Sequence, residues 1–189
     1  MRVNTFDVRN HTSLDGMKSV AAFSLCGAYR YWLARRWADG PMAVLLAMNP
    51  STADERDNDP TIERFYRRVM QWNAAGANFG AVGVVNVFAI RETDSKKLPA
   101  MIKAGVDIVG PANDDMIFSR CLDAGIVLCG WGRPGNLLNR GRQVRDMLVK
   151  GGIALHALRI NADGSPEHPL YVGYDVAPVR YEGWRLERR

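Results

Sequence analysis

The chain has 189 residues, of which 47% are apolar and 24% are charged, as in a soluble globular protein with one core. No apolar run approaches the roughly 20 residues that cross a bilayer, so no membrane partner is expected. The net charge of +5 favours an anionic partner. We expect a single domain over residues 1–189, in which an aromatic-rich segment (1–40) packs on an α/β core (41–180).

The first half of the chain predicts strands and one helix. Residues 23–37 are rich in aromatic side chains and predict an edge strand or short hairpin. Residues 43–48 are almost all apolar, as in a strand buried on both faces. Through 60–75, apolar residues recur at spacings of three and four, which predicts a helix that ends at Gly76.

The second half alternates strand and helix patterns. Apolar runs predict further strands at 81–90, 126–132 and 153–158. Helices are predicted from Thr93 or Asp94 through Leu98, at 113–124 and at 140–150. This alternation indicates parallel βαβ units. We therefore expect a three-layer α/β/α sandwich around a central, mainly parallel sheet, with a pocket at the carboxyl edge of the sheet.

The sequence lacks the motifs of several enzyme classes. The sequence contains no Gly-x-Ser-x-Gly elbow, no Walker loop and no complete dinucleotide fingerprint, so no cofactor is expected. The three cysteines and three histidines are scattered, which argues against a metal site and against disulfides. Residues 1–7 lack the apolar core of a secretory signal. We expect a cytoplasmic protein with reduced cysteines.

The basic residues are mostly arginines, and they gather in groups. Because the planar guanidinium group suits phosphate, this pattern favours nucleic acid or a nucleotide as partner. Solvated helix faces and a basic tail would account for the same pattern. The groups are Arg30, Arg35 and Arg36; Arg64, Arg67 and Arg68; Arg133, Arg140, Arg142 and Arg145; and Arg185, Arg188 and Arg189.

A polar, acidic loop follows the first buried strand. In open α/β sheets, ligands bind where such loops leave the carboxyl ends of strands. The same loop also reads as a capped turn, with Asp59-Pro60 opening the helix, and both interpretations can hold together. The candidate ligand-binding residues of the loop are Asn49, Pro50, Ser51, Thr52, Asp54 and Asp59.

Three other candidate sites follow later strands. Asn86 lies within an apolar run and is followed by Arg91; a buried amide matches the donor and acceptor edge of a nucleobase, or bonds the backbone of a neighbouring loop. Trp131-Gly132 ends another strand and allows a close approach of backbone to ligand, or forms a simple turn. His168 lies in the loop after the last predicted strand.

These segments carry a resemblance to a known family. The chain resembles the domain of unknown function 1643 family over about residues 20–175. More distantly, the motif order is similar to that of the uracil-DNA glycosylase superfamily, whose fold the expected sandwich matches. The motifs are Phe23-Ser24-x-Cys26-Gly27-x-Tyr29-Arg30-Tyr31, Met48-Asn49-Pro50-Ser51-Thr52-Ala53-Asp54, Asp59-Pro60-Thr61, Asn86-Val87-Phe88-Ala89 and His168-Pro169-Leu170-Tyr171.

The glycosylase resemblance implies roles for individual residues. Asn49 matches the residue that positions the attacking water, Asn86 the amide that reads the base, and His168 the histidine that stabilises the departing base. Two departures stand out: Asn49 cannot accept the proton of water, and the loop after His168 reads Pro-Leu-Tyr instead of Pro-Ser-Pro.

Other residues would complete the chemistry that this resemblance implies. Asp54 or Asp59 would supply the missing base, and Phe79 is the candidate for stacking on the nucleobase. Tyr171 and the arginines would contact substrate, the arginines at its phosphates.

Three functions remain open on the sequence. The first is a hydrolase of N-glycosidic bonds that acts on nucleic acid or a nucleotide. The second is a non-catalytic module that binds a nucleotide or nucleic acid in the same pocket. The third, least favoured, is a hydrolase in which Asp54, Asp57 and Asp59 hold Mg²⁺.

Overall fold

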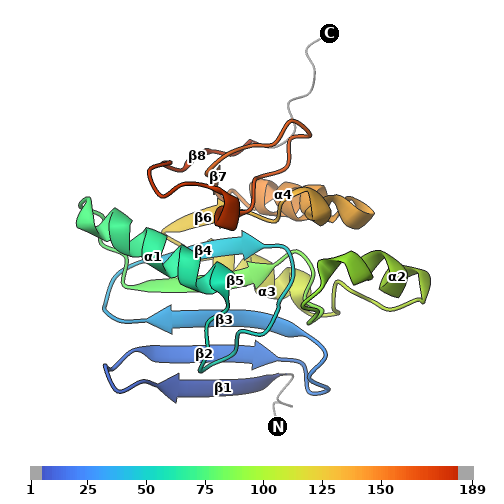
Figure 1. Ribbon diagram of the computed structural model, residues 1–189, viewed down its shortest axis with the longest axis horizontal. Helices are drawn as coiled ribbons and strands as arrows, with labels where there is room; N and C mark the ends of the chain where they lie inside the picture. The colour runs from blue at the N-terminus through green and yellow to red at the C-terminus, as the bar shows by residue number, and fades with distance from the viewer. Residues whose placement is uncertain (1–5, 183–189) are drawn as a thin grey trace.

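The computed structural model describes residues 6–182, and its strands form one mixed sheet in the order β1-β2-β3-β5-β4-β6-β7-β8 (Figure 1). Arg185, Arg188 and Arg189, which form one of the basic groups predicted to contact phosphate, lie outside this described part. The strands are β1 (Asp7–Thr12), β2 (Lys18–Phe23), β3 (Arg30–Arg36), β4 (Met42–Ala47), β5 (Ala81–Asn86), β6 (Ile126–Cys129), β7 (Leu155–Ala157) and β8 (Val179–Arg180).

The sheet is mixed, and this corrects the predicted architecture. The β1/β2, β2/β3, β3/β5 and β7/β8 pairs are antiparallel, whereas only β4/β5, β4/β6 and β6/β7 are parallel. The α/β class is right, but the three-layer sandwich with a mainly parallel, uracil-DNA-glycosylase-like sheet is wrong. The connections of β1, β2 and β3 are short turns, and a parallel pair needs a crossover of a dozen or more residues.

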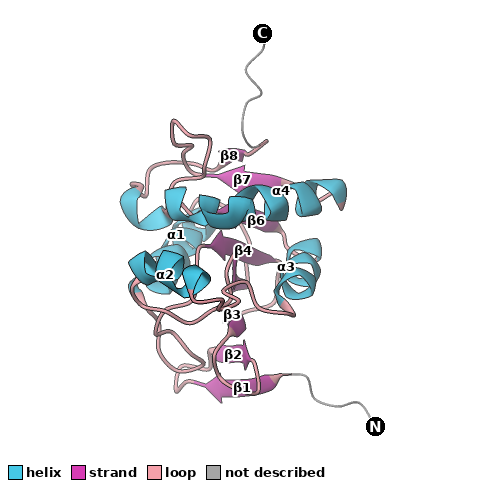
Figure 2. Ribbon diagram, turned by 90° about the vertical axis from the view of Figure 1, so that its right-hand side faces the viewer, coloured by secondary structure: helices cyan, strands magenta, loops and turns pink. Residues whose placement is uncertain are grey.

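Helices lie on the two faces of the sheet (Figure 2). Helix α1 (Pro60–Ala74) packs on one face through Ile62, Phe65 and Val69. Helices α3 (Asn113–Leu122) and α4 (Arg140–Lys150) pack on the other, where the short helix α2 (Leu98–Lys103) adds Leu98. Within residues 6–182, no helix has the length and apolar character that a membrane span requires.

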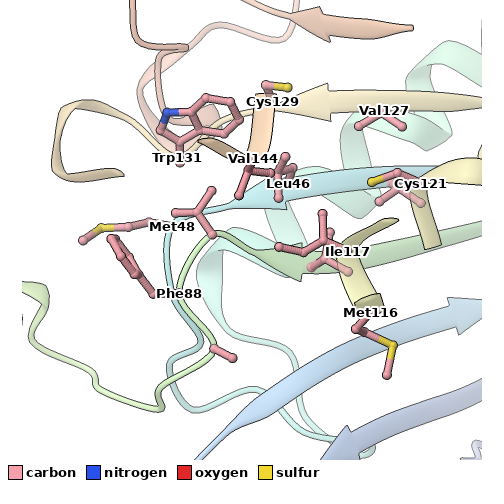
Figure 3. Packing of buried hydrophobic residues seen from close by; sticks show 14 of the residues in the cluster. Leu46, Met48, Phe88, Met116, Ile117, Cys121, Val127, Cys129, Trp131 and Val144 are labelled. Atoms are coloured by element: carbon pink, nitrogen blue, oxygen red, sulfur yellow. The ribbon is translucent and has the colours of Figure 1, made fainter. Parts of the chain in front are cut away.

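The central strand β4 divides its side chains between two cores. Successive side chains of a strand point to opposite faces, so Leu45 joins the core under α1 while Val44 and Leu46 join the core under α3 and α4. Figure 3 shows the second core, in which Leu46 and Trp131 lie near Val144 of α4. A strand apolar on both faces is therefore buried throughout, as its sequence predicts.

Element positions were predicted better than strand partners. The predictions for β4, α1, α3 and α4 agree with the structure to within two residues at each end. Strand β3 is not at an edge, because it lies between β2 and β5. Strands β5, β6 and β7 are shorter than the apolar runs that predicted them, and β1, β2 and β8 were not predicted, since the predicted segment 23–37 includes only the last residue of β2.

Strand direction decides which residues meet at one edge of the sheet. Strands β4, β5 and β6 are mutually parallel, so their carboxyl ends lie together. Strand β3 is antiparallel to β5, so its first residue, Arg30, lies at that same edge, where its N–H donates to the carbonyl of Ala89. The edge therefore collects the ends of three strands and the start of a fourth.

Candidate functional site

A cavity of about 500 Å³ opens at this edge of the sheet. That volume falls in the range of small-molecule sites. Eight of the residues predicted to form a site line it together, although they come from four separate segments of the chain. They are Asn49, Ser51, Asp59, Asn86, Trp131, Gly132, His168 and Tyr171.

Asn49 presents an acceptor to the cavity. Its side-chain Nδ2 donates to the carbonyl oxygens of Pro50 (3.0 Å) and Glu92 (2.7 Å), so both amide hydrogens are used on the backbone. The two bonds fix the orientation of the amide. Because no donor of the described residues bonds Oδ1, this oxygen remains available to a water or a ligand.

The side chain of Asn86 is buried and makes no hydrogen bond to a described residue. Its side chain, in a residue 3% exposed, lines the cavity, and its Oδ1 is buried without a partner among the described residues. Its backbone is well satisfied, since Asn113 donates Nδ2 to the carbonyls of Asn86 (3.0 Å) and Val87 (3.1 Å). Other buried atoms also lack partners, for example Asn113 Oδ1, but Asn113 does not line the cavity, so Asn86 is the amide that a ligand in the cavity would meet.

His168 is held as a neutral donor. Its Nδ1 accepts from the N–H of Leu170 (3.3 Å), which places the ring proton on Nε2. Burial lowers the pKa of His168 from its ordinary 6.5, and the negative charge of Asp59 opposes this shift only in part. The imidazole is therefore neutral at pH 7, with an Nε2–H group to offer.

The two candidate carboxylates differ in position. Asp59 lines the cavity and caps α1, where its Oδ1 accepts from the N–H groups of Thr61 (3.0 Å) and Ile62 (2.9 Å). Its Oδ2 has no hydrogen bond to a described residue. Asp54 does not line the cavity; its Oδ1 accepts from the N–H groups of Arg56 and Asp57 in its own loop.

The acidic loop does not form a metal cluster. The carboxylates of Asp54 and Asp59 are each committed to backbone N–H groups of different turns, and Asp57 is exposed. In residues 6–182, no group of three or more His, Cys, Asp or Glu side chains is placed to hold a metal ion. The predicted Mg²⁺ arrangement of Asp54, Asp57 and Asp59 is thus not assembled.

Two buried arginines of β3 hold the acidic loop in place. Arg30 Nη1 donates to the carbonyl of Ala53 (2.6 Å), and Arg35 Nη2 donates to that of Asp54 (2.5 Å). Arg35 also bonds the side chain of Asn58 through Nε (3.1 Å). Arg30 differs from Arg35 because it also lines the cavity.

Several predicted binding residues lie away from the cavity. Phe79 precedes β5 and lies at the opposite edge of the sheet, where it packs against Trp72. Pro50 is buried, and Thr52 is exposed beside the cavity wall; neither lines the cavity. Arg91 extends over the ring of Phe23 (5.0 Å) and donates to the carbonyl of Gly27.

Trp131 lines the cavity without offering its ring face to it. The side chain is fully buried in the core (Figure 3). The backbone of Gly135 and Gly141 packs against it. A Cβ atom at Gly135 would lie only 2.2 Å from Trp131 Cδ1, so these glycines are required for the packing. The exposed aromatic ring at the cavity is that of Tyr171, 5.9 Å from the His168 ring.

Many of the grouped arginines serve the fold. Arg68 is fully buried and donates to four backbone carbonyls, those of Val172, Gly173, Tyr174 and Val176. Arg64 also donates to the carbonyl of Val172, and its guanidinium group lies over the ring of Tyr174. Arg140 is buried and bonds the carbonyl of Val87 and the carboxylate of Asp114. The arginine groups that predicted a phosphate-binding surface are therefore partly internal.

Sequence reasoning named Arg30 only as one of many arginines expected at phosphates, and it named neither Glu92 nor Glu167 as a binding residue, although all three line the cavity. For Arg30 a signal existed, because it belongs to the motif Phe23–Tyr31 that carries the family resemblance. For the two glutamates no local pattern indicated a role, because loop packing alone brings them to the edge.

Comparison with known proteins places the chain in a family. Searches of curated proteins and of solved structures gave no significant match. The family model described as protein of unknown function (DUF1643) matches residues 30–170, which include Arg30, Asn49, Asp59, Asn86 and His168. Because this match covers most of the chain and ends within the loop that carries His168, the chain belongs to the DUF1643 family.

Proposed function

We propose that the protein hydrolyses the N-glycosidic bond of a nucleoside unit and releases the nucleobase. The observation that carries this proposal is the shared cavity: Asn49, Asn86 and His168, which the resemblance to glycosylases singles out, line one space of about 500 Å³. Their order in the sequence and their convergence support the same chemistry. The mixed sheet lends no support, so the proposal stands on the site alone.

In this proposal, Asn86 and Tyr171 recognise the base. In the Asn86 side chain, Nδ2 makes no hydrogen bond to a described residue, and Oδ1 is buried beside the cavity without a partner; together they are the donor and acceptor that pair with the edge of a nucleobase. Tyr171, which is 75% exposed and lines the cavity, supplies the aromatic face on which a base stacks. Tyr171 takes the role that the sequence assigned to Phe79.

The chemical step uses three groups. The oxygen of water forms a bond to the anomeric carbon of the sugar, while the bond from that carbon to the base nitrogen breaks and leaves its electron pair on the base. Asn49 Oδ1 accepts a hydrogen bond from the water and orients it, and Asp59 Oδ2 takes the proton that the water loses. His168 Nε2–H donates to the developing negative charge of the base.

The binding module remains the second candidate, and two observations favour it. Asn49 cannot take a proton at neutral pH, and Asp59 already commits one oxygen to the cap of α1. Binding would need the same cavity and the same amide of Asn86. The two functions therefore differ only in what happens to the glycosidic bond.

An incubation experiment distinguishes them. The protein is mixed with normal and modified nucleotides, nucleosides and oligonucleotides, and free base is measured by mass spectrometry. Asp59→Asn is the diagnostic variant, because asparagine is as good a helix cap as aspartate but cannot accept the proton. Asp54→Asn makes the same chemical change outside the cavity and is the matched control.

We expect base release by the wild type and by Asp54→Asn, and a loss of at least about a hundredfold in Asp59→Asn with ligand binding retained. Binding without release in all three proteins would establish the module instead. Equal release by Asp59→Asn and wild type would remove Asp59 from the mechanism.

A further inference from the structure

Arg30 is a buried cation with most of its donors unused. The residue is 3% exposed and lines the cavity, and its one hydrogen bond to the described residues runs from Nη1 to the carbonyl of Ala53. Nε and Nη2 make no hydrogen bond within the described part of the chain, and neither is sealed off from the cavity. The guanidinium group is therefore anchored on one side and open on the other.

The charge of Arg30 is not neutralised by a direct partner. No carboxylate oxygen of residues 6–182 lies within 4.0 Å of it, and Asp59, which caps α1, is the carboxylate whose charge acts most strongly on it. Burial lowers the pKa of Arg30 to about 10, so the group still carries its charge at neutral pH. A buried charge without a partner is unfavourable unless a ligand of opposite charge binds it.

The other charged side chains of the cavity rim are paired within the protein. Glu92 lies 3.4 Å from Lys97, Glu167 lies 3.3 Å from Arg159, and Arg133 lies 3.9 Å from Asp163. These pairs leave Arg30 and Asp59 as the charges directed at a ligand. A rim of mixed, paired charges differs from the continuous basic groove that follows a nucleic-acid backbone.

We propose that Arg30 binds a phosphate group, and that the substrate is a free nucleotide carrying a phosphate monoester. This inference rests on the proposed function, since that function supplies the nucleobase at Asn86. The planar fork of arginine matches phosphate oxygens with two parallel hydrogen bonds, and Nε and Nη2 form such a fork. A cavity of about 500 Å³ holds base, sugar and phosphate together, so a single nucleotide reaches both Asn86 and Arg30.

The test compares phosphorylated probes with their unphosphorylated partners. Calorimetry measures the binding of ribose 5-phosphate against ribose, and of the ribonucleoside 5′-monophosphates against the nucleosides. The variants are Arg30→Gln and, as matched control, Arg35→Gln, which removes a second anchor of the same loop without touching the cavity. Arg30→Lys keeps the positive charge and serves if the glutamine variant does not fold.

We expect the phosphate to strengthen binding to the wild type and to Arg35→Gln by at least about tenfold, and this preference to vanish in Arg30→Gln. In Arg30→Lys we expect it to fall without disappearing, because lysine lacks the fork. On the wild type, the NMR signal of the Arg30 Nε–H group should shift on addition of ribose 5-phosphate but not of ribose.

Equal binding of phosphorylated and unphosphorylated probes by the wild type, or an unchanged preference in Arg30→Gln, would overturn the inference. Base release from oligonucleotides but from no free nucleotide would overturn it as well. Because ribose 5-phosphate has no base to lose, its binding is independent of catalysis. Phosphate binding at Arg30 without base release would therefore reject the proposed hydrolase alone.

Discussion

Replacing Asn86 by leucine should stabilise the protein while it abolishes ligand binding. In the structure the Asn86 Oδ1 is buried without a partner, and an unsatisfied buried polar atom destabilises the folded state by about 1–3 kcal/mol. Leucine has a similar shape and removes this atom, so most of that free energy should be regained. For a chain of this size, each kcal/mol raises Tm by about 2–4 °C.

The matched control is Asn113→Leu. Asn113 is also buried and its Oδ1 also lacks a partner among the described residues, but its Nδ2 donates to the carbonyls of Asn86 and Val87, so the leucine variant loses two hydrogen bonds that Asn86 does not make. We expect it to be destabilised by about 1–3 kcal/mol. Urea unfolding followed by circular dichroism measures both variants, and calorimetry measures nucleotide binding. A destabilised Asn86→Leu protein would show that the amide has a structural partner, which would refute its assignment to ligand recognition.

Two further perturbations test the fold and the site. Arg68→Met removes a fully buried guanidinium that bonds backbone carbonyls of residues 172–176, and should lower the free energy of unfolding in urea by about 3–5 kcal/mol, because hydrogen bonds of a charged group are lost and buried carbonyls are left without partners. Arg67→Met loses only the exposed ion pair with Glu63 and should leave the free energy of unfolding nearly unchanged. Lowering the pH below 6.5 should destabilise the protein, because the folded-state pKa of His168 is depressed and the unfolded chain takes up the proton first. His168→Gln should weaken this dependence of stability on pH. His156→Gln should also weaken it, since burial lowers the pKa of His156 as well. An unchanged pH profile of stability in His168→Gln would mean that the imidazole is not held neutral.

Local sequence patterns were sufficient for the parts of the site that short segments build alone. The apolar run of β4, the Asn49-Pro50 stop and the Asp59-Pro60 cap are determined by neighbouring residues, so the loop and the start of α1 lie where they were predicted. A cavity lies at the carboxyl edge of the sheet, where the sequence predicts a pocket, and Asn49, Asn86 and His168 line it. They meet there because β4 and β5 are parallel and the loop of His168 returns to their carboxyl ends.

Strand partners and side-chain partners could not be predicted in this way. Nothing in the residues around Arg30 specifies that β3 runs antiparallel beside β5, yet this pairing alone brings the guanidinium group to the cavity. Phe79 is a different case, because it precedes the strand predicted at 81–90, and its place at the amino end of β5, opposite the cavity, follows from strand direction.

The sequence by itself determined the central strand, the main helices, the family and the chemistry available at the strand ends, because hydrophobic periodicity, caps and motif order are local properties. The tertiary structure decided which of those groups are free to act. Asp59 retains an open oxygen while Asp54 closes its own turn, and Asn86 lacks the partners that Asn113 has. Hydrogen bonds between distant segments make that selection, and only the folded chain brings those segments together.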